Sequence, residues 1–183
     1  MQDTQDSLQN IYQMVYTFLS CSLEEAREGY ATRVDVTLFS DGFIQAKDDG
    51  RGILLSPDEE KSEEIFRDIL EGRPFTTQDC RRMGGLYPPD LQWVNSLSES
   101  LTVTVHREGR RYRQDYHRGV PLHRLTITPS DAPSGTSILL RPDRLLFKEA
   151  TPSAEVIRSW LQEQATGLPL LTVRVKEETS SLS

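Results

Sequence analysis

The sequence predicts a single α+β domain in which helices cover one face of a largely antiparallel sheet. Three observations support this fold class: a long helical pattern near the N-terminus, a run of short segments in which apolar and polar residues alternate, and a further helix and strand near the end. The length of 183 residues fits one hydrophobic core of ordinary size.

The first elements follow from the spacing of apolar residues. A helix is predicted over about 6–28, because its apolar residues recur at intervals of three and four: Leu8, Ile11, Tyr12, Val15, Phe18 and Leu19. Alternation over 34–38 predicts a strand that returns as a hairpin after Ser40-Asp41-Gly42. Ser56-Pro57-Asp58 then opens an acidic helix that runs to about Leu70, since proline is tolerated in the first helical turn.

The second half continues the same pattern after a loop over 72–83. A short helix, four strands, a helix and a last strand are expected at about 89–98, 101–106, 110–118, 122–129, 135–141, 152–165 and 170–176. The domain is therefore expected to span 1–176, and the acidic, serine-rich stretch 177–183 is expected to be a disordered tail.

Charge and composition argue against several classes of protein. The formal net charge of −7 disfavours a general nucleic-acid binder, and the basic stretch 107–118 is expected to be a solvated strand face, so we expect no direct DNA binding. No apolar run is long enough to span a bilayer, and the acidic N-terminus does not resemble a signal peptide. Cys21 and Cys80 lack metal-ligand spacing and suit a reducing compartment, which predicts a cytoplasmic protein.

The most informative segment is 44–53, where an apolar strand runs into an acidic pair and then into two glycines that flank an arginine. Asp48 can accept a hydrogen bond from an exocyclic amine such as that of adenine. Gly50 and Gly52 let the backbone pass close to a flat ligand without a Cβ in the way. The alternative is a polar turn that follows a strand and binds nothing.

Four blocks of sequence bear on these alternatives. They are Tyr12–Tyr16 with Leu23–Ala26; Asp48–Ile53; Gly84–Leu86 with Val94–Ser98, continuing through 101–114 and 117–121; and Ser134–Thr136. In these blocks the chain resembles the N-terminal ATPase domain of the DNA gyrase B subunit and its topoisomerase IV counterpart, which are GHKL (Bergerat-fold) ATPases. The resemblance covers roughly residues 10 to 178. It implies a two-layer α/β sandwich of Bergerat type that binds ATP.

The resemblance implies an adenine pocket at positions that this chain keeps. The expected nucleotide-binding residues are Asp48, Gly50, Arg51, Gly52, Ile53, Thr136, Glu25 and Arg107. Asp48 matches the family's adenine-binding aspartate, Gly52 and Thr136 match its supporting neighbours, and Arg51 matches an arginine beside the purine. Glu25 and Arg107 match an acidic and a basic position that pair across the pocket mouth. The alternative for this last pair is an ion pair that ties the helix to the sheet.

The catalytic, metal and phosphate positions depart from the family pattern. Thr17 stands at the position of the catalytic glutamate, and Cys21 stands where an asparagine ligates Mg²⁺. A threonine hydroxyl is not a base near neutral pH, and a thiol is a poor Mg²⁺ ligand. Tyr87-Pro88-Pro89-Asp90 replaces the glycine-rich phosphate loop, which removes two N–H donors and adds a carboxylate. We therefore expect no catalytic residue, no metal site and no bound Mg²⁺.

These expectations lead to one main functional hypothesis and two alternatives. The main hypothesis is a pseudo-ATPase that holds ATP or ADP weakly, does not hydrolyse it, and works through protein contacts. One alternative is an interaction or regulatory module that mimics the ATPase domain of type II topoisomerases and leaves its pocket empty. The other is a slow ATPase completed by a partner. In each case we expect a protein partner, and a type II topoisomerase subunit is a candidate.

Overall fold

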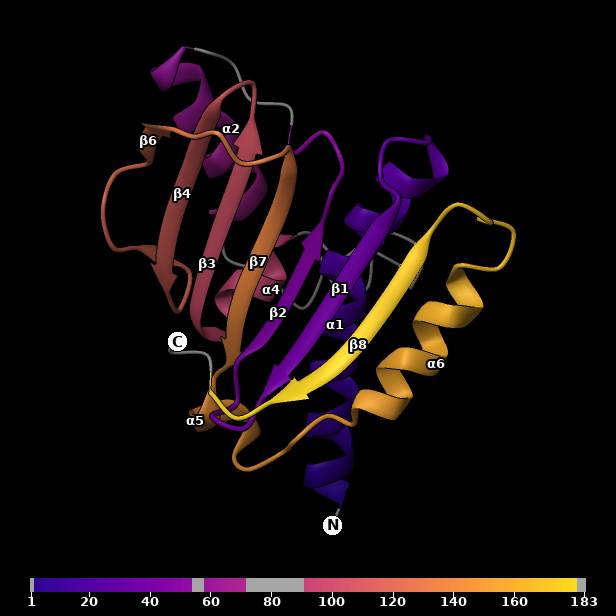
Figure 1. Cartoon of the computed structure of the whole chain (residues 1–183). Coiled ribbons are helices and arrows are strands. Elements are labelled where there is room, and N and C mark those ends of the chain that lie inside the picture. The colour runs from indigo at the N-terminus through magenta and orange to yellow at the C-terminus, as the bar shows by residue number, and fades with distance from the viewer. Residues whose placement is uncertain (1, 54–57, 72–90, 181–183) are drawn as a thin grey trace.

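The computed structural model describes residues 2–53, 58–71 and 91–180 of the chain (Figure 1). The helices are α1 (Gln2–Arg27), α2 (Glu59–Leu70), α4 (Leu91–Ser96), α5 (Arg144–Phe147) and α6 (Ala154–Gln164). The strands are β1 (Arg33–Phe39), β2 (Ile44–Asp48), β3 (Ser98–Arg107), β4 (Arg110–His117), β5 (Val120–Pro121), β6 (Thr126–Pro129), β7 (Gly135–Pro142) and β8 (Thr172–Glu178).

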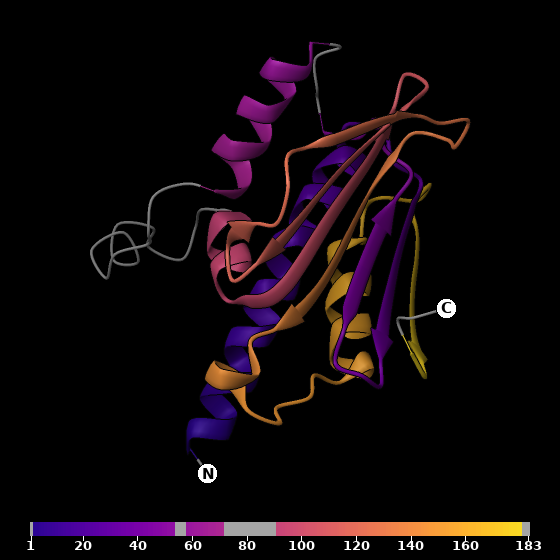
Figure 2. The same ribbon diagram turned by 90° about the vertical axis from the view of Figure 1, so that its left-hand side faces the viewer.

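The strands form one sheet in the order β5-β4-β3-β7-β2-β1-β8, and β6 also pairs with β4. The pairing of β1 with β8 is parallel, and the other described pairings are antiparallel. Figures 1 and 2 show the helices gathered on one face of this sheet. The predicted fold class, a largely antiparallel sheet with helices on one face, is therefore confirmed.

The core lies between the sheet and the long helix α1. Six apolar side chains of α1 are almost fully buried: Ile11, Met14, Val15, Phe18, Leu19 and Leu23. Opposite them, β3 contributes Leu101, Val103 and Val105, which alternate with half-buried residues because successive side chains of a strand point to opposite faces. The intervals of three and four in α1 and of two in β3 thus bury the two matching apolar faces against each other.

An aromatic stack joins α1 to α6 at the side of the sheet. The rings of Tyr16 and Trp160 lie 4.1 Å apart between centroids at an interplanar angle of 12°, and Tyr12 stacks on Tyr16 at 6.1 Å. The hydroxyl of Tyr12 accepts a hydrogen bond from the backbone N–H of Ser153 at 2.8 Å, just before α6 begins. These contacts fix the first part of α1 against the C-terminal helix.

Three elements differ most from those predicted. The strand expected over 122–129 is shortened to β6 (Thr126–Pro129), and the two-residue β5 comes before it; in the segment between them, Gln114 donates a side-chain hydrogen bond to the carbonyl of His123. The short helix α5 was not expected; Asp143 caps it by accepting from the backbone N–H of Leu145 at 3.0 Å.

The third difference concerns the end of the domain. The last strand begins and ends two residues later than expected, and Glu177 and Glu178 pair with Leu38 and Phe39 of β1. The expectation that these two residues belong to a disordered tail was therefore wrong. Their charged side chains are exposed at the edge of the sheet, so their polarity is compatible with a strand. Residues 181–183 of that tail lie outside the described residues, as does the loop expected over 72–83.

Within the described ranges, no helix combines the length and the apolar character that a bilayer crossing requires.

Candidate functional site

A cavity of about 250 Å³ lies between α1 and the adjoining ends of β2 and β7. Its apolar lining consists of Phe18, Ala46, Ile53, Ile69, Leu91 and Ile138. Its polar lining consists of Cys21, Ser22, Glu25, Asp48, Arg51, Gly52 and Thr136. The arrangement, a cleft in which apolar walls and converging polar groups are combined, is typical of a small-molecule site.

Asp48 supplies the hydrogen-bond acceptor of this cavity. It is the last residue of β2, and the antiparallel register places it opposite Thr136 of β7. One carboxylate oxygen accepts from the hydroxyl of Ser22 at 2.7 Å, and the other accepts from the backbone N–H of Gly50 at 3.0 Å. Burial raises the pKa of Asp48, while the hydrogen bonds from Ser22, Gly50 and the backbone of Thr136 oppose that rise. The carboxylate is thus fixed in orientation by its own protein before any ligand arrives.

The glycines around Asp48 allow close packing of the protein on itself. A Cβ on Gly50 would lie 2.9 Å from a carboxylate oxygen of Glu25, and one on Gly135 would lie 2.3 Å from the carbonyl oxygen of Asp48. Gly52 has a φ of +79° and leaves only 2.8 Å to a methyl group of Val105. These glycines therefore also let α1, β2, β3 and β7 approach one another, and the expectation that Gly50 and Gly52 make room for a ligand stays a prediction.

Arg51 and Glu25 form the charged side of the cavity. The Arg51 guanidinium donates to the two carboxylate oxygens of Glu25 at 2.8 and 3.3 Å, and the Arg51 backbone N–H donates to Glu25 at 2.9 Å. Arg51 also ion-pairs with Glu28 at 3.0 Å and lies 3.6 Å above the ring of Tyr30. The hydrogen bond from the Arg51 side chain lowers the pKa of Glu25, so Glu25 is held as an anion.

Arg107 does not form the ion pair with Glu25 that the sequence suggested. Its guanidinium donates to the backbone carbonyl of Arg51 at 3.2 Å and lies 3.6 Å from a carboxylate oxygen of Glu108. Its charge still helps to lower the pKa of Glu25 from a distance. Arg51 takes the direct role because its backbone and side chain both reach Glu25, which gives it three hydrogen bonds to one carboxylate.

Thr17 and Cys21, which the resemblance puts at the catalytic and metal positions, lie one turn apart on α1 and have different surroundings. Thr17 is 3% exposed, and its hydroxyl donates to the carbonyl of Gln13 at 2.6 Å within the same helix. Cys21 lines the cavity and is exposed to solvent at its mouth; the protein atoms around its thiol, followed by the charges of Asp48 and Glu24, raise its pKa to about 11. Neither side chain supplies a base near neutral pH.

The nearby carboxylates are committed to other partners. Glu24 forms an ion pair with Arg27, and Glu25 is held by Arg51. Neither is therefore a free general base at the Thr17 position. The part of the chain that the structure describes also holds no group of three His, Cys, Asp or Glu side chains that suits a metal ion. The expectation that Mg²⁺ does not bind stays a prediction.

The structure brings most of the expected site residues together and adds others. The expected residues that line the cavity are Glu25, Asp48, Arg51, Gly52, Ile53 and Thr136. Ser22 was missed, although it lies three residues before Glu25 and four after Phe18, and this helical spacing places all three on one face. Ile69 and Leu91 were missed because no sequence pattern indicates that α2 and α4 border the cavity. The altered phosphate-loop positions 87–90 lie outside the described residues.

The raised pKa of Cys21 leads to a chemical prediction. Alkylation of Cys21 by iodoacetamide at pH 7.5 is expected to be on the order of tenfold slower than that of N-acetylcysteine, because little thiolate forms and its higher basicity compensates only in part. Mass spectrometry of the peptide that carries Cys21 measures the rate separately from that of Cys80. A rate equal to that of the free thiol would show that the cavity does not perturb Cys21.

No family model matches the chain. It is similar to the DNA gyrase B subunit of Thermotoga maritima, with 33% identity over 171 residues that cover 91% of this chain and 27% of the relative. A mitochondrial DNA gyrase B subunit of Arabidopsis thaliana is 36% identical over 92% of this chain and 24% of its own length. The DNA topoisomerase 4 B subunit of Staphylococcus epidermidis is 31% identical over 85% of this chain and 24% of its own length. The chain thus spans about a quarter of the curated relatives it matches.

The chain also has the fold of a solved structure. That structure is the 43K ATPase domain of Thermus thermophilus gyrase B in complex with an aminocoumarin, with a TM-score of 0.77 and 25% sequence identity. The match covers 93% of this chain and 44% of that chain.

Proposed function

Because this chain belongs to the family of DNA gyrase and topoisomerase IV B subunits, as a homologue of the ATPase domain, we propose that it is a pseudo-ATPase. In this proposal the cavity beside Asp48 takes the base of ATP or ADP, the chain does not hydrolyse the nucleotide, and its biological effect comes through protein contacts.

The observation that carries the proposal is the contrast between Asp48, which faces α1 across the cavity, and Thr17, which is part of α1. Asp48 lines the cavity opposite Thr136, with its carboxylate oriented by two hydrogen bonds. Thr17, at the position of the catalytic glutamate, is buried with its hydroxyl bonded to its own helix. The hydrogen-bond acceptor for adenine is therefore present. The general base that would activate water is missing from the position where the family carries it.

The phosphate side of the site is argued from the chemistry of the residues. Cys21 is held as a neutral thiol by its raised pKa of about 11, and such a group is a poor ligand for Mg²⁺. Pro88 and Pro89 lack the N–H groups that a phosphate loop uses, and Asp90 adds a negative charge. We therefore expect the base to contribute most of the affinity and the phosphates to contribute little.

The partner is proposed to be a protein, and a subunit of a type II topoisomerase is the candidate suggested by the names of the relatives. We do not expect direct DNA binding, because the basic strand β4 carries its own counter-charge; Arg113, for example, pairs with Asp115 at 3.1 Å. A cytoplasmic location is part of the same proposal.

Magnesium-dependent ATP turnover by the purified chain tests the absence of catalysis. We expect turnover no higher than that of a blank without protein. Turnover by the wild type that Asp48→Ala abolishes would contradict the proposal. Turnover that appears only after a type II topoisomerase is added would instead identify a slow ATPase completed by its partner.

A specific contact favours the alternative of an interaction module with an empty pocket. Asp48 already accepts hydrogen bonds from Ser22 and Gly50, so a ligand amine would have to share oxygens that are partly satisfied. Calorimetry with adenosine distinguishes the two functions, because an interaction module of this kind releases no heat of binding with any adenine compound.

A further inference from the structure

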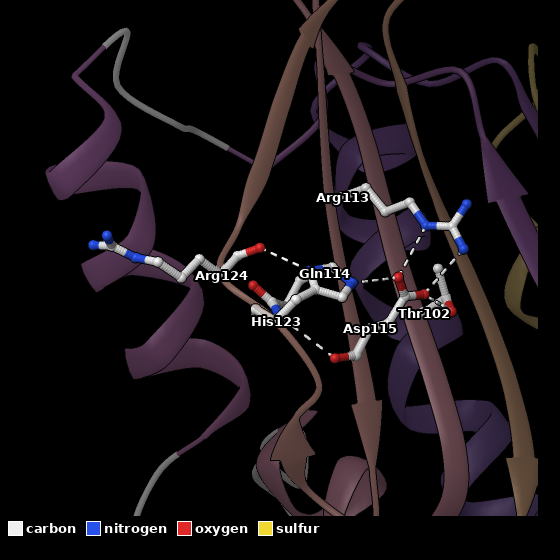
Figure 3. Close-up of polar contacts among 6 residues, drawn as sticks. All are labelled: Thr102, Arg113, Gln114, Asp115, His123 and Arg124. Carbon is white, nitrogen blue, oxygen red and sulfur yellow. Dashed lines mark hydrogen bonds and ion pairs between the residues drawn. The ribbon is translucent and has the colours of Figure 1, made fainter.

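His123 lies in the segment 122–125, which joins β5 to β6 where the two strands follow one another along β4, at the far edge of the sheet from β8. Its Nε2 is 2.7 Å from a carboxylate oxygen of Asp115, and its Nδ1 is 2.7 Å from the carbonyl oxygen of Arg124. Figure 3 shows the ring between these two oxygens. Both ring nitrogens of His123 therefore face a hydrogen-bond acceptor.

This arrangement suits the doubly protonated ring. An imidazolium ion has an N–H on each nitrogen and donates to both oxygens. A neutral imidazole has one N–H, so one of its nitrogens would turn a lone pair toward the oxygen of Asp115 or Arg124. Loss of one proton thus replaces an attractive contact of His123 with a repulsive one.

The acceptor Asp115 is kept ionised by its other neighbours. Thr102 of β3 donates to one of its oxygens at 2.5 Å, and the Arg113 guanidinium donates to both oxygens at 3.1 and 3.2 Å. Burial opposes ionisation, but the hydrogen bonds from Arg113, Thr102 and His123 lower the pKa of Asp115 to about 2. The carboxylate is therefore an anion over the whole range in which a histidine titrates.

The 122–125 segment is held by polar contacts and by one buried apolar side chain, Leu125, which is 5% exposed. The carbonyl of His123 accepts from the side chain of Gln114 at 2.5 Å, and the backbone N–H of Leu122 donates to the carbonyl of Asp115 at 2.9 Å. The side chain of Leu122 is 65% exposed, so at the His123 end the segment depends on these polar contacts, while Leu125 anchors its other end. The Arg124 guanidinium lies 3.3 Å from a carboxylate oxygen of Glu63 of α2. This ion pair links the 122–125 segment to the helix whose Ile69 lines the cavity.

We propose that His123 is a pH-sensitive latch. In its protonated form it holds the 122–125 segment against β4, and it releases the His123 end of this segment when the ring loses a proton. The charged groups that face the latch are Asp115 and Arg113 of β4, with Glu63 of α2 reached through Arg124. Contact with α2 is made by the exposed side chain of Arg124 and not by His123 itself. The latch does not depend on whether the cavity holds a nucleotide.

The direction of the pH dependence follows from the contacts. The Arg124 carbonyl, and after it Asp115, raise the pKa of His123 above its ordinary value of 6.5, while burial and the charge of Arg113 oppose the rise. A raised pKa in the folded state means that the stabilising contacts are complete below the ordinary value. They are lost as the pH rises through the folded-state value. The latch is thus closed in acid and opens toward alkaline pH.

Amide hydrogen exchange of the peptide that contains residues 122–125 tests the proposal. The exchange rates are measured by mass spectrometry and corrected for the intrinsic effect of pH. Protection of residues 120–126 in the wild type is expected to fall roughly threefold to tenfold between pH 6 and pH 8.5, a modest change because the His123 side chain is 40% exposed. His123→Gln is expected to show low protection at both pH values. Equal protection of the wild type at both values, or unchanged pH dependence in His123→Gln, would overturn the latch.

A ring titration by nuclear magnetic resonance keeps the proposal testable if a variant folds poorly. In the wild type, the His123 ring is expected to carry protons on both nitrogens below its transition and to titrate above 6.5. Asp115→Asn is the matched variant, since it removes the charge but keeps the shape, and it should move the transition to lower pH. A wild-type transition at or below 6.5, or one that Asp115→Asn leaves in place, would overturn the assignment.

Discussion

Gly135→Ala is expected to destabilise the folded chain by about 3 kcal/mol and to abolish binding in the cavity. The new Cβ would lie 2.3 Å from the carbonyl oxygen and 3.3 Å from the carbonyl carbon of Asp48. Both are backbone atoms of β2, so no side-chain rotation relieves the overlap. The two strands must separate where Asp48 pairs with Thr136, and this separation displaces the acceptor of the site.

Urea unfolding followed by tryptophan fluorescence measures this loss, with Gly109→Ala as the control. Gly109 lies in the turn between β3 and β4 with a φ of +74°, and an added Cβ there meets nothing within 4 Å beyond its chain neighbours among the described residues. The control therefore adds the same methyl group without an overlap and should cost about 1 kcal/mol through backbone strain alone. If Gly135→Ala were as stable as Gly109→Ala, β7 and β2 would not be in the close contact described here.

Asp48→Asn is expected to weaken adenosine, ADP and ATP alike, by roughly tenfold to a hundredfold, because the lost contact is a hydrogen bond to a charged group. All three ligands share the base, so their losses should be equal. Asn has only one oxygen for the donors that Asp48 now satisfies, the Ser22 hydroxyl and the Gly50 N–H. The variant therefore also leaves an amide group facing a donor in the cavity.

The neighbouring carboxylate provides a matched control for this change. Asp49 accepts from the backbone N–H groups of Thr32 and Arg33 at 2.8 and 2.9 Å, and it does not line the cavity. Asp49→Asn is expected to leave the affinity for adenosine unchanged, although it weakens these two contacts. Equal loss of affinity in both variants would show that the effect is a general disturbance of the turn.

The sequence predicts the elements of this fold more completely than their contacts. The spacing in α1 and the alternation in β3 were sufficient to place both, since each buries one face of a regular element. The late start of the strand expected over 122–129 was not predictable, because at His123 a side chain of β4, Gln114, takes the place of backbone pairing. The strand at Glu177 and Glu178 was missed because charged residues at an exposed sheet edge resemble a polar tail.

In the site, too, the sequence predicts which residues take part more completely than which residues contact each other. Asp48 and Thr136 were identified from the resemblance, and their antiparallel register brings them together. The partner of Glu25 was mistaken, because spacing along the chain does not show which of two arginines reaches a carboxylate on a helix. His123 and Asp115 are eight residues apart on different segments, and no sequence period indicates that they touch.

Isothermal titration of the wild type with adenosine, ADP and ATP, each in Mg²⁺ and in EDTA, tests the central claim most directly. The pseudo-ATPase proposal predicts that all three bind with Kd values of roughly 0.1–1 mM, or about −4 to −5.5 kcal/mol, because the charge-assisted phosphate contacts are missing. It also predicts that Mg²⁺ has no effect on these affinities. A tenfold preference for ATP with Mg²⁺ over adenosine would contradict the account, because it would mean that other residues rebuild the phosphate site.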